Sequence, residues 1–437
     1  MATGIIVVPA SLGPLAAPER WPFSLVVILG LVVVAALDAL RAHGRLDGIS
    51  ATLPELTRLT KDKEGAIPVT ILREKPSTGL LRLALSLPSE FHSGDPSLTV
   101  VFAKEEGKFV VQWTCTPLKR GNYTLEKVYV AADSPLRLWS CHAALSAPGE
   151  LRVYPNIHQE RKNLAALFLN RGLMGIHAQR QVGKGRDFEQ LREYIPGDSF
   201  EDIHWKATAR RGVPVTKIYQ IERTQEVYVI IDTSRLSGRE VLDAEGKRKT
   251  SQLERFINAA MVLALVAERQ GDHFGLLTFD DRVRHFLHAR NGKAHFDACR
   301  DAVYTLEPKP VNPDFEELCT FIRLRMPKRA LLIVLTNLDD PVLSESFVRN
   351  VDLISSHHLV LVNMLTPPGV RPLFSSDDVE TLDDLYAHLG GHMEWHDLIE
   401  LKSVLHFHGA TLSLLRHETM TADLVSQYIN QKQRQLL

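Results

Sequence analysis

Catalytic signatures are absent from this 437-residue chain. It contains no Gly-x-Ser-x-Gly, His-Glu-x-x-His, Walker A or Gly-x-Gly-x-x-Gly run, so the sequence indicates none of the hydrolase, zinc-protease or nucleotide sites that these runs mark. An excess of charge is also lacking, because 51 basic side chains face 52 acidic ones. This balance gives no reason to expect a nucleic-acid partner.

Cysteine is scarce as well. The four thiols form no Cys-x-x-Cys pair, which argues against a zinc site. Small buried thiols in a reducing compartment are the favoured interpretation. The alternative, if the chain is exported, is a disulfide between Cys115 and Cys141. The other two cysteines are Cys299 and Cys319.

Long apolar runs are lacking except for one near the N-terminus. Trp21–Leu40 contains a single charged residue, Asp38. About 20 helical residues at ~1.5 Å each cover roughly 30 Å, the thickness of a bilayer core. We therefore predict a transmembrane helix over residues 21–42, after an N-terminal segment, 1–20. A cleaved signal peptide and a buried soluble helix are the alternatives.

The charges beside this helix indicate its orientation. Arg41 and Arg45 follow it, whereas only Arg20 precedes it closely. The positive-inside bias predicts a single-pass protein of the inner (plasma) membrane with the bulk of the chain in the cytoplasm. The short apolar run Ile5–Pro9 is interpreted as a remnant of a second membrane segment.

Residues 48–156 have the pattern of a small β domain. Short strand-like runs alternate with turn residues, and no long amphipathic run occurs. The pattern predicts an antiparallel, immunoglobulin-like β-sandwich. The expected strands are Ile67–Leu72, Gly79–Leu87, Ser97–Ala103, Lys108–Thr116, Tyr123–Val130 and Glu150–Tyr154.

Residues 226–437 alternate between strand and helix patterns. Val227–Ile231 is a continuous apolar run, typical of a strand covered on both faces. A helix is expected from the N-cap Ser251 to Gln270, ended by Gly271. The alternation predicts an α/β fold with a doubly wound, mainly parallel sheet. Further strands are expected at 273–279, 283–288, 330–335, 358–365 and 410–415, and helices at 293–306, 314–325, 343–354, 377–407 and 422–435.

Oxygen-bearing side chains follow two of these strands. Asp232 and Ser234 come after the first strand, and Asn337 and Asp339 come after the strand that ends at Leu335. Ligands of such sheets bind beyond the carboxyl ends of the strands, so we expect both loops to meet at one rim. Hard oxygen ligands of this kind suit Mg²⁺, the one cofactor that the sequence suggests.

The first loop resembles the metal-ion-dependent adhesion site of von Willebrand factor type A domains. That site begins Asp-x-Ser-x-Ser, but here the third ligand is replaced by Leu236, and Ser237 comes one position late. Asn337 stands where an acid is expected. The expected threonine is not obvious, since Pro310–Asp314 offers Asn312 and Asp314 instead. We interpret the site as degenerate, a loop that hydrogen-bonds its own backbone.

A second resemblance lies upstream, in the linker and signature segment 157–225. Gly185–Arg211 reads GRDFEQLREYIPGDSFEDIHWKATARR and closely resembles the signature of a bacterial family called domain of unknown function 58. Glu201 departs from the basic residue of many relatives. The matching positions are Phe188, Leu191, Arg192, Tyr194, Pro196, Gly197, Asp198, Ile203, Trp205, Thr208, Ala209 and Arg210.

The family resemblance implies a function. Its members are membrane-anchored, carry a type A-like domain and accompany MoxR-type AAA+ ATPases. We therefore expect a non-catalytic scaffold or adaptor in the lipid bilayer, whose partners are such an ATPase and other membrane-complex proteins. The apolar residues of the signature are interpreted as anchors spaced along an extended segment: Phe188, Leu191, Tyr194, Ile203 and Trp205. The whole signature is interpreted either as a segment that docks the linker onto the sheet or as a partner-binding surface rich in Trp, Tyr and Arg.

Three other hypotheses stay open on the sequence alone. The chain could be a metal-dependent, adhesin-like receptor outside the cytoplasm, which requires an intact divalent site. It could be a hydrolase that uses Asp232, Ser234 and Asp339, although no histidine base is placed beside them. Finally, His388, His392 and His396 recur every four residues as metal ligands on a helix do, but Gly390 and Gly391 are expected to break that helix.

Overall fold

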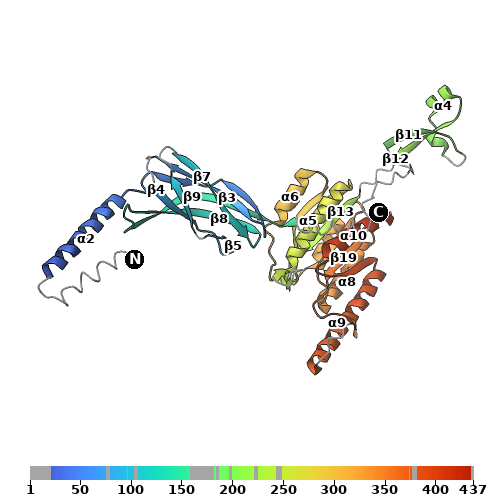
Figure 1. Ribbon diagram of the computed structural model, residues 1–437. Helices are drawn as coiled ribbons and strands as arrows, with labels where there is room; N and C mark the ends of the chain where they lie inside the picture. The colour runs from blue at the N-terminus through green and yellow to red at the C-terminus, as the bar shows by residue number, and fades with distance from the viewer. Residues whose placement is uncertain are drawn as a thin grey trace. The chain divides into compact units, whose positions relative to one another are not determined.

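The computed structural model divides the chain into two compact units at Asn156 and Ile157 (Figure 1). The residues that it describes are 21–74, 79–95, 97–102, 107–157, 182–183, 187–195, 199–220, 225–242, 249–373, 375 and 381–434.

The first unit begins with an apolar helix, α2 (Trp21–Ala42). Its bounds are those predicted from the sequence, and it is long and apolar enough to cross a membrane. The helix ends on Ala42, which is buried, and the chain then enters the β region.

Two sheets make up the rest of the first unit. They share one core, in which Ile67 and Trp113 of the smaller sheet lie with Leu83 and Val128 of the larger one. The smaller sheet has the order β1-β3-β7-β5 and the larger one β2-β9-β8-β4-β6. The strands are β1 (Ile49–Thr52), β2 (Leu56–Thr60), β3 (Gly65–Arg73), β4 (Gly79–Leu85), β5 (Phe91–His92), β6 (Leu98–Phe102), β7 (Lys108–Pro117), β8 (Gly121–Asp133) and β9 (Ser140–Tyr154).

The larger sheet differs from the prediction in two respects. It is not purely antiparallel, because β2 pairs with β9 in parallel. Strand β9 also begins at Ser140, ten residues before the predicted start at Glu150. The first half of β9 (SCHAALSAPG) is rich in small residues and contains a proline, which weakens the strand pattern there.

The signature segment folds into a small sheet and a short helix. The sheet has the order β10-β12-β11, with β10 (Val182–Gly183), β11 (Asp187–Glu193) and β12 (Val215–Gln220). Between β11 and β12 lie η3 (Phe200–Asp202) and α4 (Trp205–Arg211). The extended arrangement expected for the signature residues is therefore wrong for Phe200–Asp202 and Trp205–Arg211, which are helical. A basic, partly helical linker is expected from the sequence over 158–184, of which the structure describes only 182 and 183.

A six-stranded sheet forms the centre of the second unit. Its order is β17-β16-β13-β18-β19-β20, and only the edge strand β17 is antiparallel to its neighbour. The mainly parallel sheet follows the predicted alternation of strands and helices. The strands are β13 (Glu226–Asp232), β16 (His273–Phe279), β17 (Val283–Arg290), β18 (Leu331–Leu335), β19 (Leu359–Leu365) and β20 (Ala410–Leu415).

Helices cover both faces of this sheet (Figure 1). One face carries α5 (Gln252–Arg269), α6 (Lys293–Val303) and α10 (Met420–Arg434). The other carries α7 (Phe315–Arg325), α8 (Pro341–Ser355) and α9 (Leu382–Phe407). Ser251 caps α5 by accepting a hydrogen bond from the Glu254 amide, and Gly271 follows the helix with a φ of 75°. A short hairpin, β14 (Glu240–Leu242) with β15 (Lys249–Ser251), precedes α5.

The predicted break in α9 does not occur. Gly390 and Gly391 lie inside a helix that runs without interruption from Leu382 to Phe407. A Cβ on Gly391 would lie 2.1 Å from the carbonyl oxygen of Gly369. Glycine is therefore required here for the close approach of another backbone segment rather than for a turn.

Candidate functional site

The two predicted polar loops meet at one rim of the central sheet. Strands β13 and β18 are parallel neighbours, with Ile231 opposite Leu335. From β13 the chain goes to β16 on one side and returns to β18 on the other, so this is the point where the strand order reverses. Crevices that bind ligands form at such points in open α/β sheets. The prediction that both loops lie together is confirmed.

Asp232 occupies the centre of the rim and is fully buried. Its Oδ1 accepts a hydrogen bond from the Ser234 amide (2.8 Å), and its Oδ2 accepts one from the Thr336 hydroxyl (2.6 Å). Burial raises the pKa of Asp232, while these hydrogen bonds act in the opposite direction. Both carboxylate oxygens are thus engaged by neutral donors of the protein. Sequence analysis missed Thr336, the first residue after β18, as the partner of Asp232.

Ser234 and Ser237 are used by their own loop. The Ser234 hydroxyl accepts a hydrogen bond from the Leu236 amide (3.4 Å) at the start of η4 (Arg235–Gly238). The Ser237 hydroxyl donates to the Ser234 carbonyl (2.9 Å), and Leu236 is buried in the core. Ser237, which comes one position late in the sequence pattern, therefore bonds to its own loop. The position that the resemblance assigns to a third metal ligand is thus occupied by the apolar side chain of Leu236.

Asn337 and Asp339 also have partners within the protein. The buried Asn337 amide donates to the Leu236 carbonyl (3.3 Å) and to the side chain of Gln252. Asp339 lies further out and pairs with Arg239. Asn337 thus joins the first loop to α5. Asn337 is an amide, whereas the type A pattern that the sequence resembles has an acid at this position.

In the third segment considered in the sequence, Pro310–Asp314, Asn312 and Asp314 have partners other than Asp232. Asn312 accepts a hydrogen bond from Arg235 (2.5 Å), and the same guanidinium pairs with Asp340 (3.3 Å). Asp314 is the N-cap of α7, where it accepts from the Glu317 amide (2.9 Å). Both side chains have structural roles in loop closure and helix capping.

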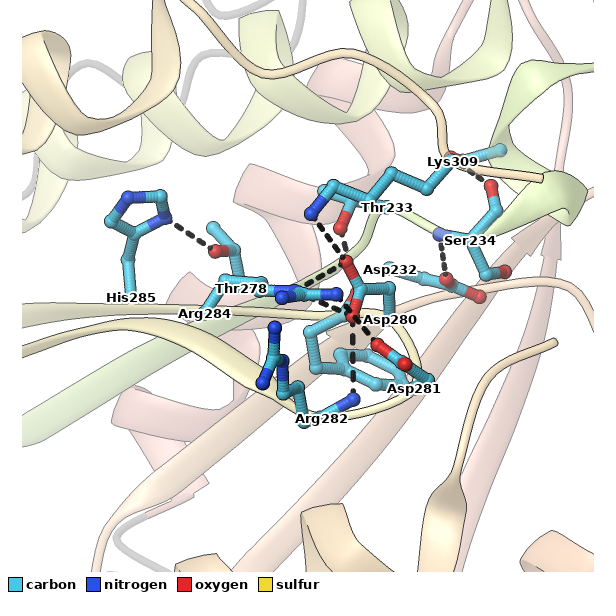
Figure 2. A network of polar contacts seen from close by, with 12 residues as sticks. Asp232, Thr233, Ser234, Thr278, Asp280, Asp281, Arg282, Arg284, His285 and Lys309 are labelled. Carbon is cyan, nitrogen blue, oxygen red and sulfur yellow. Dashed lines mark hydrogen bonds and ion pairs between the residues drawn. The ribbon is translucent and has the colours of Figure 1, made fainter. Parts of the chain in front are cut away.

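A second buried carboxylate, Asp280, lies at the end of the neighbouring strand β16 (Figure 2). Arg284 Nε donates to both of its oxygens (2.6 and 2.7 Å), and Lys309 Nζ lies 3.3 Å away. Although burial opposes ionisation, hydrogen bonds and charge from Arg284 and Lys309 hold the pKa of Asp280 well below its usual range. Sequence analysis missed this group, since its two cations come from different parts of the chain, Arg284 from strand β17 and Lys309 from the loop before α7.

The rim residues do not fit a divalent cation as they stand. In the part of the chain that the structure describes, no group of three or more His, Cys, Asp or Glu side chains could hold a metal ion. The candidate ligands Asp232 and Asn337 are bound to other protein groups, and Leu236 brings no oxygen. Two of the three histidines at that spacing in α9 are also engaged, since His388 contacts Arg371 and His392 accepts from the Leu373 amide (3.1 Å).

The hydrolase hypothesis gains no support from the geometry. Ser234 is buried, and no histidine among the described residues is hydrogen-bonded to it. A serine nucleophile requires a base within hydrogen-bonding distance.

The signature residues fall into three groups. Pro196, Gly197 and Asp198 lie outside the described residues. Ile203 is buried and forms an isolated bridge with Thr216, as expected of an anchor. Trp205, expected to be an anchor too, is 69% exposed on α4, and this expectation is wrong. Tyr194 stacks on Phe200, with ring centroids 5.9 Å apart. Arg192 lies on β11, and Arg210 is exposed on α4.

The fold and the rim define a class of protein. The second unit is a mixed α/β domain whose switch point is closed by its own polar groups, and the first unit has two β-sheets and an apolar helix. The family is given by the sequence comparison. Residues 190–371 match the family model described as "Protein of unknown function DUF58". This match confirms the recognition made from the signature segment.

The similar individual proteins include several that are themselves uncharacterized. The uncharacterized proteins Mb1516 of Mycobacterium bovis and Rv1480 of Mycobacterium tuberculosis are each 23% identical over 202 residues, which is 46% of this chain. The match spans 61% of the length of these relatives. Among solved structures, the conserved hypothetical protein BatB from Bacteroides thetaiotaomicron is similar at 14% identity with a TM-score of 0.31, covering 48% of this chain and 99% of that one. Proximal thread matrix protein 1 from the mussel byssus has 11% identity and a TM-score of 0.27, covering 47% of this chain and 45% of that one.

Proposed function

We propose that this protein is a non-catalytic, membrane-anchored scaffold whose von Willebrand factor type A-like domain binds a partner without a metal ion. The observation that carries the proposal is the internal closure of the rim. Asp232 is the residue that the resemblance matches to the first metal ligand of a type A domain. Both of its carboxylate oxygens accept hydrogen bonds within the protein, one from the Ser234 amide and one from the Thr336 hydroxyl. This arrangement favours the scaffold over the metal-dependent receptor.

The signature segment supplies a second surface for binding. Phe200 and Trp205 are 74% and 69% exposed, and Arg210 and Arg211 are exposed on the same short helix as Trp205. Tryptophan and arginine are enriched among residues that dominate binding energy at interfaces. We infer that this surface contacts the partner. The family resemblance makes a MoxR-type AAA+ ATPase in the cytoplasm the expected partner, with the ATPase performing the nucleotide-driven work.

The proposal is tested by co-purification of the full chain in detergent with a MoxR-type ATPase from the same cells. We expect the ATPase to be recovered with the wild type. Trp205→Ala should weaken binding by about 30-fold, the loss typical of an interface hot spot of roughly 2 kcal/mol. Phe407→Ala is the matched control, because Phe407 is an exposed aromatic residue (88%) on a different helix, α9.

Two results would count against the scaffold. One is the recovery of no ATPase with the wild-type chain. The other is equal recovery with Trp205→Ala and Phe407→Ala, which would remove the signature surface from the interface. A Mg²⁺-dependent gain in binding that Asp232→Ala abolishes would support the metal-dependent receptor instead.

A further inference from the structure

The end of the apolar helix is fastened to one loop of the first unit, Ser134–Trp139, called the interface loop below. The Asp38 carboxylate is buried and accepts hydrogen bonds from the Ser134 hydroxyl and the Leu136 amide (3.0 Å). The Ser134 hydroxyl in turn accepts from the Trp139 amide (3.0 Å). A charge in an apolar helix is thus used to hold a loop of the β domain.

Two further contacts flank this one along the helix. The Trp139 indole N–H donates to the Ala35 carbonyl (2.9 Å), and the Cys141 thiol contacts the Ala42 carbonyl (3.3 Å). Ala35, Asp38 and Ala42 are spaced by three and four residues, so they lie on one face of the helix. Three contacts over two turns fix the helix to the domain instead of leaving a free tether.

The contact of Trp139 fixes the level of the interface loop along α2. Trp139 meets the helix at Ala35, and at ~1.5 Å per residue this is about 4–5 Å before Asp38 and about 10 Å before Ala42. The apolar stretch itself continues to Leu40. If the helix crosses a bilayer, the loop beside Ala35–Asp38 therefore lies within the headgroup layer and not clear of it.

The side chains of the loop suit that layer. Leu136 and Trp139 are 56% and 51% exposed, and Leu37 and Leu40 are exposed on the adjacent helix. Tryptophan concentrates at membrane interfaces, where its ring is apolar and its N–H is satisfied. Two exposed arginines accompany them, Arg41 on α2 and Arg137 in the interface loop. Such side chains can pair with lipid phosphates.

We propose that the interface loop is a lipid-binding anchor, with Leu136 and the Trp139 ring inserted into the headgroup region beside α2. The inference rests on the membrane anchorage that forms part of the proposed function. The segment that crosses the hydrocarbon core then ends near Asp38 instead of Ala42, which leaves about 18 helical residues, or roughly 27 Å, for the crossing. The lipid anchor also makes the β domain a body held at a fixed depth against the bilayer.

The test uses the full chain in vesicles of phosphatidylcholine and phosphatidylglycerol. A polarity-sensitive fluorophore is attached to the thiol of Leu136→Cys. The background variant Cys141→Ser removes a reactive thiol and keeps a hydroxyl that can donate to the Ala42 carbonyl. The matched control is Leu118→Cys, since Leu118 is exposed near the start of β8, whereas the interface loop follows its end. Thirteen residues of strand at ~3.3 Å each separate the two sites by about 40 Å. Flotation with the vesicles is measured on the same samples.

We expect the Leu136 fluorophore to be blue-shifted and quenched by lipids that carry a shallow quencher, at least threefold more than the Leu118 fluorophore. Adding Asp38→Ala should reduce this quenching by about half or more while flotation is retained. Equal quenching at both sites in floating vesicles would overturn the lipid anchor and leave the membrane anchorage standing. A chain that does not float would overturn both.

Discussion

Two buried carboxylates on neighbouring strands, Asp232 and Asp280, are treated in opposite ways by the fold. Asp232 ends β13 and receives hydrogen bonds from neutral donors only, so that burial raises its pKa. Asp280 follows β16 and receives Arg284 and Lys309, which hold its pKa well below its usual range in spite of burial. Burial alone therefore does not determine the charge of an acid. The chemical type of its partners does.

This contrast explains how the rim is closed. A carboxylate held by two cations of the protein has little attraction for a metal ion, because its charge is already compensated. A carboxylate held by hydroxyl and amide donors has no free oxygen in this arrangement. Cations around Asp280 and neutral donors around Asp232 thus both leave a carboxylate that is already satisfied by the protein.

The largest expected effect is that of Asp280→Asn. It leaves Arg284 and Lys309 without their buried counter-charge, and breaking such a pair costs about 3 kcal/mol of stability. The measurement is hydrogen exchange at the most protected amides of β16 in the full chain. Asp281→Asn is the control, since this exposed carboxylate pairs with the same Arg284 and should matter by less than ~1 kcal/mol. Equal losses in the two variants would contradict the assignment.

The pH dependence should separate the two acids next. The lowered pKa of Asp280 means that its stabilisation is present above the unfolded value of about 3.9 and is lost as the pH falls through that value towards the folded one. The raised pKa of Asp232 reverses the sign, so its contribution is lost as the pH rises from about 3.9 through the folded value. From pH 7 to pH 4 the cost of Asp280→Asn should therefore shrink and that of Asp232→Asn should grow. Parallel slopes in hydrogen exchange would be inconsistent with this account.

A smaller effect is expected for Asp232→Asn at pH 7. The amide oxygen can accept from the Ser234 amide, and its N–H₂ group can donate to the Thr336 hydroxyl, so the loss should be about 1 kcal/mol or less. Calorimetric titration with Mg²⁺ should give no binding heat for the wild type or the variant. Heat that appears with the wild type and vanishes in the variant would identify Asp232 as a metal ligand.

The smallest effect belongs to the outer part of the rim. Arg239→Ala removes the partner of Asp339, and because both side chains are partly exposed the loss should be roughly 0.5 kcal/mol. Arg349→Ala, which breaks a more exposed pair with Glu345, should cost nothing measurable in the same thermal unfolding assay. A larger loss for Arg349→Ala would mean that exposure is a poor guide here.

The backbone of the second unit was largely predictable because its strands are continuous apolar runs. Val227–Ile231 and Leu331–Leu335 are buried on both faces, and such runs between helical patterns indicate a parallel sheet. The meeting of Asp232 with the loop after Leu335 followed from that sheet. The signature segment was harder, since the exposure of Trp205 depends on a hairpin that its sequence pattern does not indicate.

The sequence by itself determined the apolar helix, the alternation that builds the sheet, the family resemblance, and the apolar residue Leu236 among the polar residues of the first loop. Only the tertiary structure decided that Thr336 meets Asp232, that Arg284 and Lys309 surround Asp280, and that Asp38 holds the interface loop. The physical reason is the range of the interactions. Hydrophobic periodicity is written in neighbouring residues, whereas the partner of a buried charge comes from wherever the fold brings a donor within hydrogen-bonding distance.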